Sequence, residues 1–307
     1  METLWRGNAN AWECDELGHL NVRAYAAKAW EAIGTLSDRI GMRGAFAANA
    51  TATLIPRELH VRFLAEARPG APLEIAGGVA DWDDRTLEAV LVMRQPDRDR
   101  PTATFRFQLA HADPVYRSVF AWPDRARTAL EALRIQPPPE AAPRGLKPAA
   151  PAEDVSRARA DALGLAEVGI GRFGPADVDI FGRMRPDTPI GKVSDGVVHF
   201  ATGFPEEWTA HSSDEGLRVA GALLEARVLY RRFATAGEGF VMRSGLTAAS
   251  EKVRSLVHWV LDPATGEPWW TMEGVACLMD LDERRLRPAD PDTLKALKAA
   301  CIEGLAV

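Results

Sequence analysis

The sequence of 307 residues predicts an α+β fold made of two tandem units. A short acidic motif occurs twice, once within residues 12–21 and again within residues 176–185. Downstream of the motif, the two halves of the chain carry glycines and prolines at matching positions. Each half also places one helical stripe before a series of strand-like segments. Together these observations predict a duplicated unit that consists of one helix and an antiparallel sheet.

The duplication is indicated by the motif and by the register that follows it. Both copies read acid, any residue, Asp, any two residues, Gly, a basic residue and an apolar residue, and the copies are 164 residues apart. From Glu58 and Glu225 onward the halves align without a gap at a spacing of 167 residues. The matched glycines and prolines are Gly70 with Gly237, Gly78 with Gly245, Pro96 with Pro263 and Pro101 with Pro268. Because the period is a whole domain, the chain is expected to be a tandem pair and not a solenoid.

Each half begins with a stretch whose periodicity predicts a helix. Apolar residues recur every three or four positions from Val22 to Ile40 in the first half and from Ile190 to Phe204 in the second. Both apolar stripes are wide, so each helix is expected to pack against a sheet. The strand-like segments that follow are 54–64, 73–81, 86–94 and 102–110, then 225–232, 239–247, 254–261 and 269–279.

A proline-rich segment separates the halves. Six prolines lie between Ile135 and Ala152, with several alanines and few bulky apolar residues. Proline fixes φ and lacks a backbone donor, so this segment is expected to be extended and unpacked. The sequence therefore predicts an N-terminal unit over 1–134, a Pro/Ala-rich linker over 135–152 and a C-terminal unit over 153–307.

The composition narrows the classes of protein that fit. The chain is 47% hydrophobic and 26% charged, which is typical of a globular protein, and its net charge of −6 argues against nucleic-acid binding. Three widely spaced cysteines indicate a reducing compartment, and neither a secretory signal nor a membrane-spanning segment is evident. We therefore expect a cytoplasmic protein. The absence of metal-ligand spacing and of nucleotide-binding motifs predicts neither a metal nor a cofactor.

The first motif and the helix after it resemble the N-terminal signature of hotdog-fold thioesterases. The similar pattern occurs in 4-hydroxybenzoyl-CoA thioesterase-like and acyl-ACP thioesterase-like proteins. The residues that carry the resemblance are Asp15, Gly18, His19, Asn21, Tyr25 and Glu31. Val22 departs from the pattern, which commonly has a second Asn there. The segment 58–63 with Gly70 also resembles the strand that follows the central helix in this family.

The resemblance implies a fold and an activity. Each half would be a long central helix wrapped by a curved antiparallel sheet, and the two units would pair as an intrachain pseudo-dimer, a double hotdog. Such pairing would cover an exposed sheet edge. Acyl-CoA or acyl-ACP substrates would bind between the units and be hydrolysed. A homo-oligomer of the pseudo-dimer is a further expectation.

Asp15 is the candidate catalytic base or nucleophile, because a carboxylate can activate water or attack a thioester directly. The alternative is that Asp15 caps the following helix. Gly18 could bring backbone N–H groups to an oxyanion, or could simply form a turn. His19 and Asn21 are expected to support Asp15. Cys14, next to Asp15, is interpreted as a small buried residue and not as a nucleophile.

The second copy differs in its basic positions. Arg183 replaces His19 and Arg185 replaces Asn21, so the guanidinium of Arg183 is expected to hold Asp179 ionised and paired. The second site would then be catalytically degenerate. Arg183 and Asp179 would form a structural ion pair, or Arg183 would bind an anion such as a phosphate or a carboxylate.

Two residues of the second predicted helix could also reach Asp15 across the pseudo-dimer. They are Asp195, which matches Glu31, and His199, one turn later. The alternative is that Asp195 is a solvated or structural acid.

An acyl-thioester hydrolase is thus the leading hypothesis. A hotdog enoyl-thioester hydratase or dehydratase and a non-catalytic acyl-thioester binding protein are the alternatives. The sequence selects neither the acyl chain nor the carrier.

Overall fold

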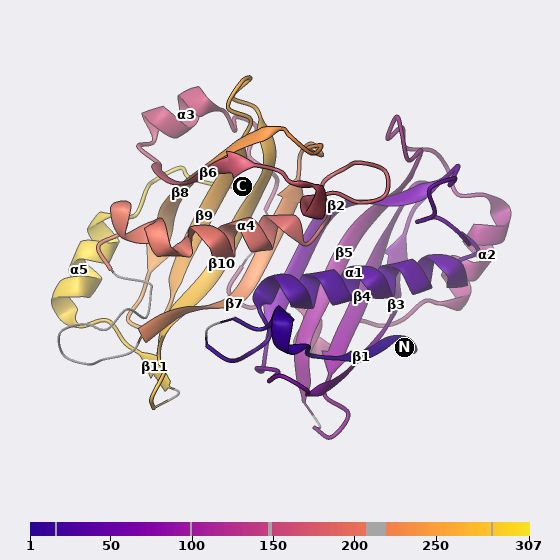
Figure 1. Cartoon of the computed structure of the whole chain (residues 1–307), viewed down its shortest axis with the longest axis horizontal. Coiled ribbons are helices and arrows are strands. Elements are labelled where there is room, and N and C mark those ends of the chain that lie inside the picture. The colour runs from indigo at the N-terminus through magenta and orange to yellow at the C-terminus, as the bar shows by residue number, and fades with distance from the viewer. Residues whose placement is uncertain (16, 99, 147–148, 207–218, 284) are drawn as a thin grey trace. The chain divides into compact units, whose positions relative to one another are not determined.

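The structure is a computed structural model that describes residues 1–307 except 16, 99, 147–148, 207–218 and 284. The chain divides into two compact units. The first consists of residues Met1–Pro143 and Val178–Thr188, and the second of Arg144–Asp177 and Pro189–Val307. Each unit contains an antiparallel sheet with a helix lying across its strands (Figure 1).

The sheet of the first unit has the strand order β1-β3-β4-β5-β2. Its strands are β1 (Glu2–Asn8), β2 (Thr53–Phe63), β3 (Pro72–Trp82), β4 (Thr86–Arg94) and β5 (Pro101–Ala112). Helix α1 (Val22–Arg39) crosses β1 to β4 and buries Ala29, Ile33 and Leu36 completely. The predicted helix of this half and its four predicted strands are confirmed, with ends that move by no more than two residues.

The sheet of the second unit has the strand order β7-β10-β9-β8-β6, and β11 pairs with β10. Its strands are β6 (Ala166–Arg172), β7 (Val219–Tyr230), β8 (Gly239–Ala249), β9 (Arg254–Leu261), β10 (Pro268–Asp280) and β11 (Arg285–Arg287). All four strands predicted for this half are present.

The second predicted helix is shorter than its apolar stripe suggested. Helix α4 covers Thr188–Gly196 and continues as the 3₁₀ helix η4, Val197–Thr202. A Cβ at Gly196 would lie 2.2 Å from the Met242 Cε and 3.1 Å from the Val168 carbonyl oxygen. The helix therefore passes very close to the sheet here, and two β-branched valines follow, which disfavour continuation of an α-helix.

The irregularities of the two sheets repeat, which confirms the duplication. A register shift between Thr3 and Trp5 in β1 recurs between Glu167 and Gly169 in β6. A second shift, in β3 opposite β4, recurs at the same place in β8 opposite β9. A third, in β2 opposite β5, recurs in β7 opposite β10. Bulges are specific structural features, and here they occur at matching positions in both sheets. Residues of the two units can therefore be paired one to one.

Several elements were not predicted. They are β1, β6, β11, α2 (Asp124–Ala132), α3 (Arg157–Ala162), α5 (Pro291–Ala299) and the short 3₁₀ helices η1 (Ala11–Glu13), η2 (Pro139–Ala141) and η3 (Pro175–Asp177). Most of β1 is exposed, so the strand lacks the clear alternation of apolar and polar residues that reveals a half-buried strand.

The expectation of an unpacked linker is wrong for the described residues of 135–152. Ala141 in η2 is fully buried, and Nη1 of Arg62 donates to the carbonyl oxygens of Glu140 and Ala142. The backbone N–H groups of Arg144 and Gly145 donate to the Glu225 carboxylate. The prolines of this segment have no backbone N–H to donate. Other backbone groups of the segment form hydrogen bonds instead, with Arg62 of β2 and with Glu225 of β7.

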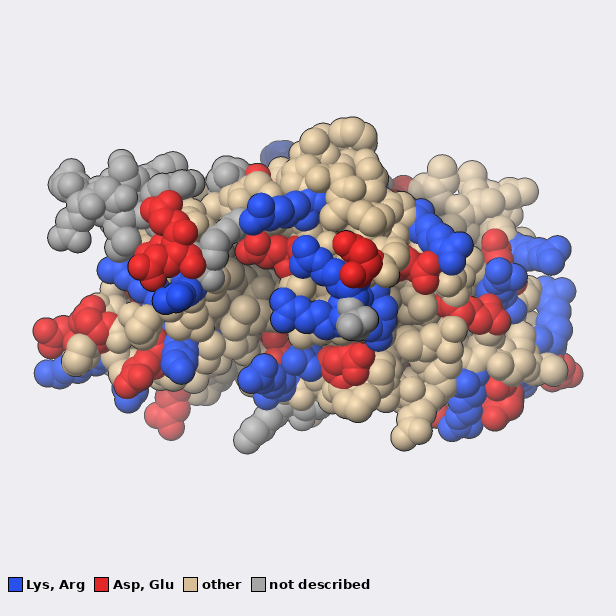
Figure 2. Space-filling model, turned by 90° about the horizontal axis from the view of Figure 1, so that it is seen from below, with Lys and Arg blue, Asp and Glu red and all other residues tan. Residues whose placement is uncertain are grey.

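The surface mixes the two signs of charge. On the face drawn in Figure 2, basic and acidic side chains lie next to one another. Among the helices of the described residues, none is long and apolar enough to cross a membrane.

Candidate functional site

The first acidic motif forms a tight loop in front of α1. The backbone N–H of Asp15 donates to the His19 carbonyl oxygen, and the N–H of Gly18 donates to the Asp15 carbonyl oxygen, both at 3.0 Å. Gly18 has φ +75°, a conformation that strongly favours glycine. Gly18 therefore forms the turn, and its own N–H is already engaged, so it does not offer the free oxyanion donor considered above.

The Asp15 side chain faces His19 within this loop. One carboxylate oxygen accepts from the Leu17 N–H at 3.0 Å, and the other lies 3.4 Å from Nδ1 of His19. The side chains of Asp15 and His19 are 17% and 19% exposed, so both are largely buried yet reachable from solvent. Asp15 does not cap α1, and the alternative reading of this residue is wrong.

Asn21 is the residue that caps α1. Its side-chain oxygen accepts from the Arg23 N–H at 2.9 Å, and its backbone is extended. An asparagine at this position satisfies a donor that the helix would otherwise leave open. Asn21 thus has a structural role as the N-cap of α1. Its direct participation in catalysis stays a prediction.

A second carboxylate, which the sequence did not identify, lies near His19. Nε2 of His19 lies 4.0 Å from a carboxylate oxygen of Glu66, so the imidazole has an acid on each side. The buried Tyr25 hydroxyl holds this segment, because it accepts from the Ala67 N–H and donates to the Ala65 carbonyl oxygen. Glu66 lies in irregular backbone after β2, where no periodicity marks it.

Cys14 does not offer a thiolate. Burial raises the pKa of its thiol, and the carboxylates of Asp15 and Glu13 raise it further. Its Sγ donates to the Asn10 carbonyl oxygen. A protonated, half-buried thiol is a poor nucleophile, which supports the interpretation of Cys14 as a packing residue.

The second copy of the motif has the same backbone but different chemistry. The Asp179 N–H donates to the Arg183 carbonyl oxygen, and the Gly182 N–H donates to the Asp179 carbonyl oxygen, as in the first loop. Here, however, Nε of Arg183 donates to the Asp179 carboxylate at 2.6 Å, and the Arg183 backbone N–H donates to it at 3.2 Å. The Asp179 carboxylate is therefore neutralised by its own loop.

Arg183 also anchors the second loop to the sheet of the first unit. Its side chain is 1% exposed, and Nη2 donates to the Leu54 carbonyl oxygen and lies 3.4 Å from the Thr53 hydroxyl. Burial lowers the pKa of the guanidinium, while Asp179 opposes this shift. Nearby, the buried Asp187 accepts from both Arg185 and Arg23. These contacts support a structural role for the second copy.

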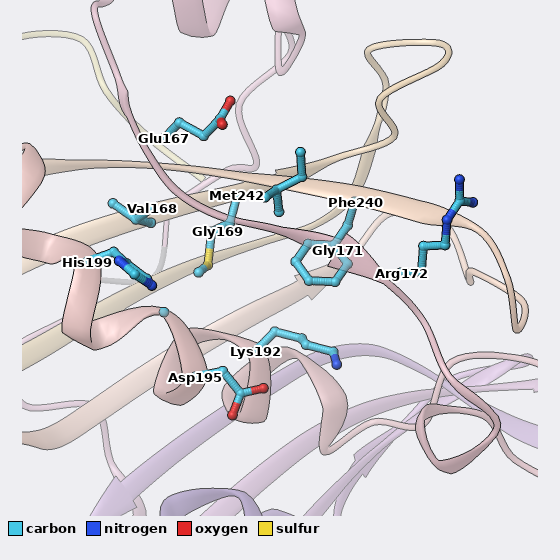
Figure 3. A pocket seen from close by; sticks show the side chains of 12 residues that line it. Glu167, Val168, Gly169, Gly171, Arg172, Lys192, Asp195, His199, Phe240 and Met242 are labelled. Atoms are coloured by element: carbon cyan, nitrogen blue, oxygen red, sulfur yellow. The ribbon is translucent and has the colours of Figure 1, made fainter.

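Asp195 and His199 lie on α4 and η4 and line a pocket of about 500 Å³ within the second unit. Figure 3 shows both side chains, with Lys192, on the helical side of this pocket, opposite the glycines of β6. Whether either side chain also acts with Asp15 stays a prediction.

Comparison with known proteins agrees with the duplicated fold. The family model of the thioesterase-like superfamily matches residues 9–134 and again residues 173–297. The solved structures that resemble this chain include a putative oleoyl thioesterase from Lactobacillus plantarum, at 11% identity over 89% of this chain and 94% of that chain, with a TM-score of 0.64. The 12:0-ACP thioesterase from Umbellularia californica matches at 12% identity over 93% of both chains, also with a TM-score of 0.64.

An acyl-ACP thioesterase from Bacteroides thetaiotaomicron matches at 13% identity over 89% of this chain and 96% of that chain, with a TM-score of 0.62. At such identities the structural likeness establishes the fold alone. No curated protein matches the sequence significantly. The family model, however, covers most of the chain in two consecutive segments. The chain therefore belongs to the thioesterase-like superfamily, with two hotdog units in tandem.

Proposed function

We propose that this protein hydrolyses acyl thioesters, carried by CoA or by acyl carrier protein, at the loop that holds Asp15. The observation that carries the proposal is the difference between two loops of the same backbone. Asp15 pairs with an imidazole and remains partly exposed, whereas Asp179 is neutralised by the buried Arg183. Membership of the thioesterase-like superfamily supports the same activity. The similar solved proteins include two acyl-ACP thioesterases.

In the proposed reaction the Asp15 carboxylate removes a proton from water, and the resulting hydroxide adds to the thioester carbonyl carbon. The carbonyl π electrons move to oxygen and give a tetrahedral oxyanion. When the carbonyl re-forms, the carbon–sulfur bond breaks and the thiolate takes up the proton. The products are a carboxylic acid and a free thiol. Direct attack by Asp15, which would form an anhydride that water then opens, is the other route open to a carboxylate.

The backbone N–H of His19 is the candidate donor for the oxyanion. This N–H makes no hydrogen bond to any residue that the structure describes. In the second loop the matching N–H, that of Arg183, donates to the Asp179 carboxylate. A backbone donor that is preorganised in this way is worth about 10²–10³ in turnover.

The remaining residues of the loop have supporting roles in this proposal. His19 lies between the carboxylates of Asp15 and Glu66 and would orient Asp15 toward the water. Asn21 holds the start of α1, which fixes the position of the loop. In the double-hotdog arrangement, Asp195 or His199 would add a group from the other unit.

The test is hydrolysis of a panel of acyl-CoA and acyl-ACP thioesters, measured as release of free thiol. Asp15→Asn should lower kcat by about 10²–10⁴, the usual contribution of a general base. Asp179→Asn, the same change in the second loop, is the matched control. It should cost stability, because it leaves the buried Arg183 without its counter-ion, but kcat per folded molecule should stay within a few-fold of wild type. The proposal fails if no thioester in the panel is cleaved, or if Asp15→Asn is as fast as wild type.

A further inference from the structure

The two units differ at one residue of their first strands. Trp5 in β1 stands opposite Ile75, and Gly169 in β6 stands opposite Met242. Both residues follow the same register shift, so Gly169 occupies the position that Trp5 has in the first unit. The second unit therefore lacks a large aromatic side chain that the first unit places between its edge strand and its helix.

The first unit shows what this space accommodates. The indole N–H of Trp5 donates to a carboxylate oxygen of Glu31 at 2.7 Å. The ammonium of Lys28 lies 5.1 Å from the centre of the indole and is held by Glu13 at 2.7 Å. The ring covers Gly7, where any Cβ would lie 2.6 Å from the indole. The space is thus shaped for a flat ring with an N–H donor at one end and a cation over its face.

The second unit keeps these surroundings without the indole. Asp195 matches Glu31, Lys192 matches Lys28, and Lys192 is held by Asp177 at 3.1 Å just as Lys28 is held by Glu13. The Asp195 side chain lines the pocket and makes no hydrogen bond or ion pair with another described residue. A pocket of about 500 Å³ opens here, within the size range of ligand sites.

Two substitutions add flat side chains to the walls of this pocket. Phe240 replaces Leu73, and its ring lies over Gly171 and 5.5 Å from the Lys192 ammonium. His199 replaces Thr35 at the other end of the pocket (Figure 3). Phe240 thus fills part of the space that the indole takes in the first unit, but it brings no N–H donor for Asp195.

We propose that this pocket binds a planar aromatic heterocycle that carries an N–H group. The ring lies between the β6 glycines and α4, against Phe240, and its N–H donates to the Asp195 carboxylate. Lys192 is already paired with Asp177, so the pocket offers a carboxylate acceptor and no unpaired ammonium. A fatty acyl chain does not fit this description, because it would cover the Asp195 carboxylate without offering it a hydrogen-bond donor.

Indole is the direct probe, because it is the side chain of Trp5 without the backbone. Binding is measured by ligand-observed NMR and by isothermal titration on the full chain, with benzothiophene, which has sulfur in place of the N–H, as the matched ligand. Indole should bind with a Kd of about 1 mM, typical of a fragment of this size. Benzothiophene and the Asp195→Ala variant should each lose about tenfold or more in affinity, since a hydrogen bond to a charged acceptor is lost.

A variant that refills the pocket provides the second arm of the test. Gly169→Trp combined with Phe240→Leu and Met242→Ile recreates the first unit's arrangement, with Trp5, Leu73 and Ile75 as the matching residues, and should abolish indole binding. Glu31→Ala, which alters the matching acid of the first unit, should leave indole binding unchanged. The proposal is overturned if wild type does not bind indole at 10 mM, about ten times the expected Kd. It is equally overturned if the refilled variant binds as wild type does, or if benzothiophene binds as tightly as indole.

Discussion

At the scale of single residues, one substitution separates the two acidic loops. His19 and Arg183 occupy the same position on the same backbone, and each faces the Asp of its own loop. The guanidinium also donates to the start of β2, whereas the imidazole lies beside Glu66. The sequence predicted the pairing of Arg183 with Asp179 because the residues are four apart in matched motifs. It did not predict Glu66, because the contact with His19 depends on how an irregular segment folds back over α1.

Replacing Arg183 should be strongly destabilising. Arg183→Leu removes the counter-ion of Asp179 and two hydrogen bonds to β2, and leaves the carboxylate with backbone donors alone in a mostly buried site. Loss of one partner of a buried ion pair costs about 3–5 kcal/mol. Urea unfolding measures the change, with Arg134→Ala, which breaks only exposed ion pairs, as a control expected to cost less than about 1 kcal/mol. Equal costs for the two variants would contradict the anchoring role.

At the scale of elements, alternation and helical periodicity predicted every strand that has a clear buried face. β1 and β6 were missed because they are short, largely exposed edge strands, and β6 carries two glycines. The change from α4 to η4 also could not be predicted, because it depends on how closely Gly196 approaches the sheet. Close approach of backbone to backbone is a property of the packed unit and has no signature in the local sequence.

The start of α1 allows the two roles of Asn21 to be separated. Asn21→Ser keeps a side-chain acceptor for the Arg23 N–H, whereas Asn21→Ala loses it. The alanine variant should therefore lose about 1 kcal/mol of unfolding free energy, and the serine variant only a few tenths. Thioester hydrolysis is then measured on both. If the serine variant retains stability and turnover, Asn21 acts through the helix cap; a serine variant that is stable but slow would indicate a direct part in the reaction.

At the scale of the whole molecule, the duplication was predicted from matched glycines and prolines, and the repeated register shifts confirm it. The packing of 135–152 was predicted wrongly, because proline content describes the local chain and not the partners that Arg62 and Glu225 supply. The predicted domain limits place 178–188 with the C-terminal half, whereas these residues pack with the first unit. Long-range contacts of this kind follow from the assembled fold.

The acid stability of the whole molecule should depend on one buried pair of the second unit. His258 is buried against Phe200, and its Nδ1 lies 2.7 Å from the Ser244 hydroxyl. Burial lowers the pKa of His258 to about 3, so the folded protein keeps this imidazole neutral. The unfolded chain takes up a proton near pH 6.5. Between these values the unfolded state binds more protons, so stability falls as the pH falls, by up to about 1.4 kcal/mol per pH unit.

The first unit supplies a replacement without a titrating group, since Gly77 and Leu91 occupy the positions of Ser244 and His258. The double variant Ser244→Gly with His258→Leu should lose the pH dependence of stability that His258 causes. Changing Ser244 as well avoids leaving its buried hydroxyl without a partner. Unfolding free energies of wild type and variant, measured from pH 7 to pH 4, should therefore diverge steadily in favour of the variant below about pH 6.5. Carboxylates contribute equally to both proteins, so the difference isolates the imidazole. Parallel curves over this range would mean that His258 is protonated in the folded state, and that the second unit opens enough to hydrate it.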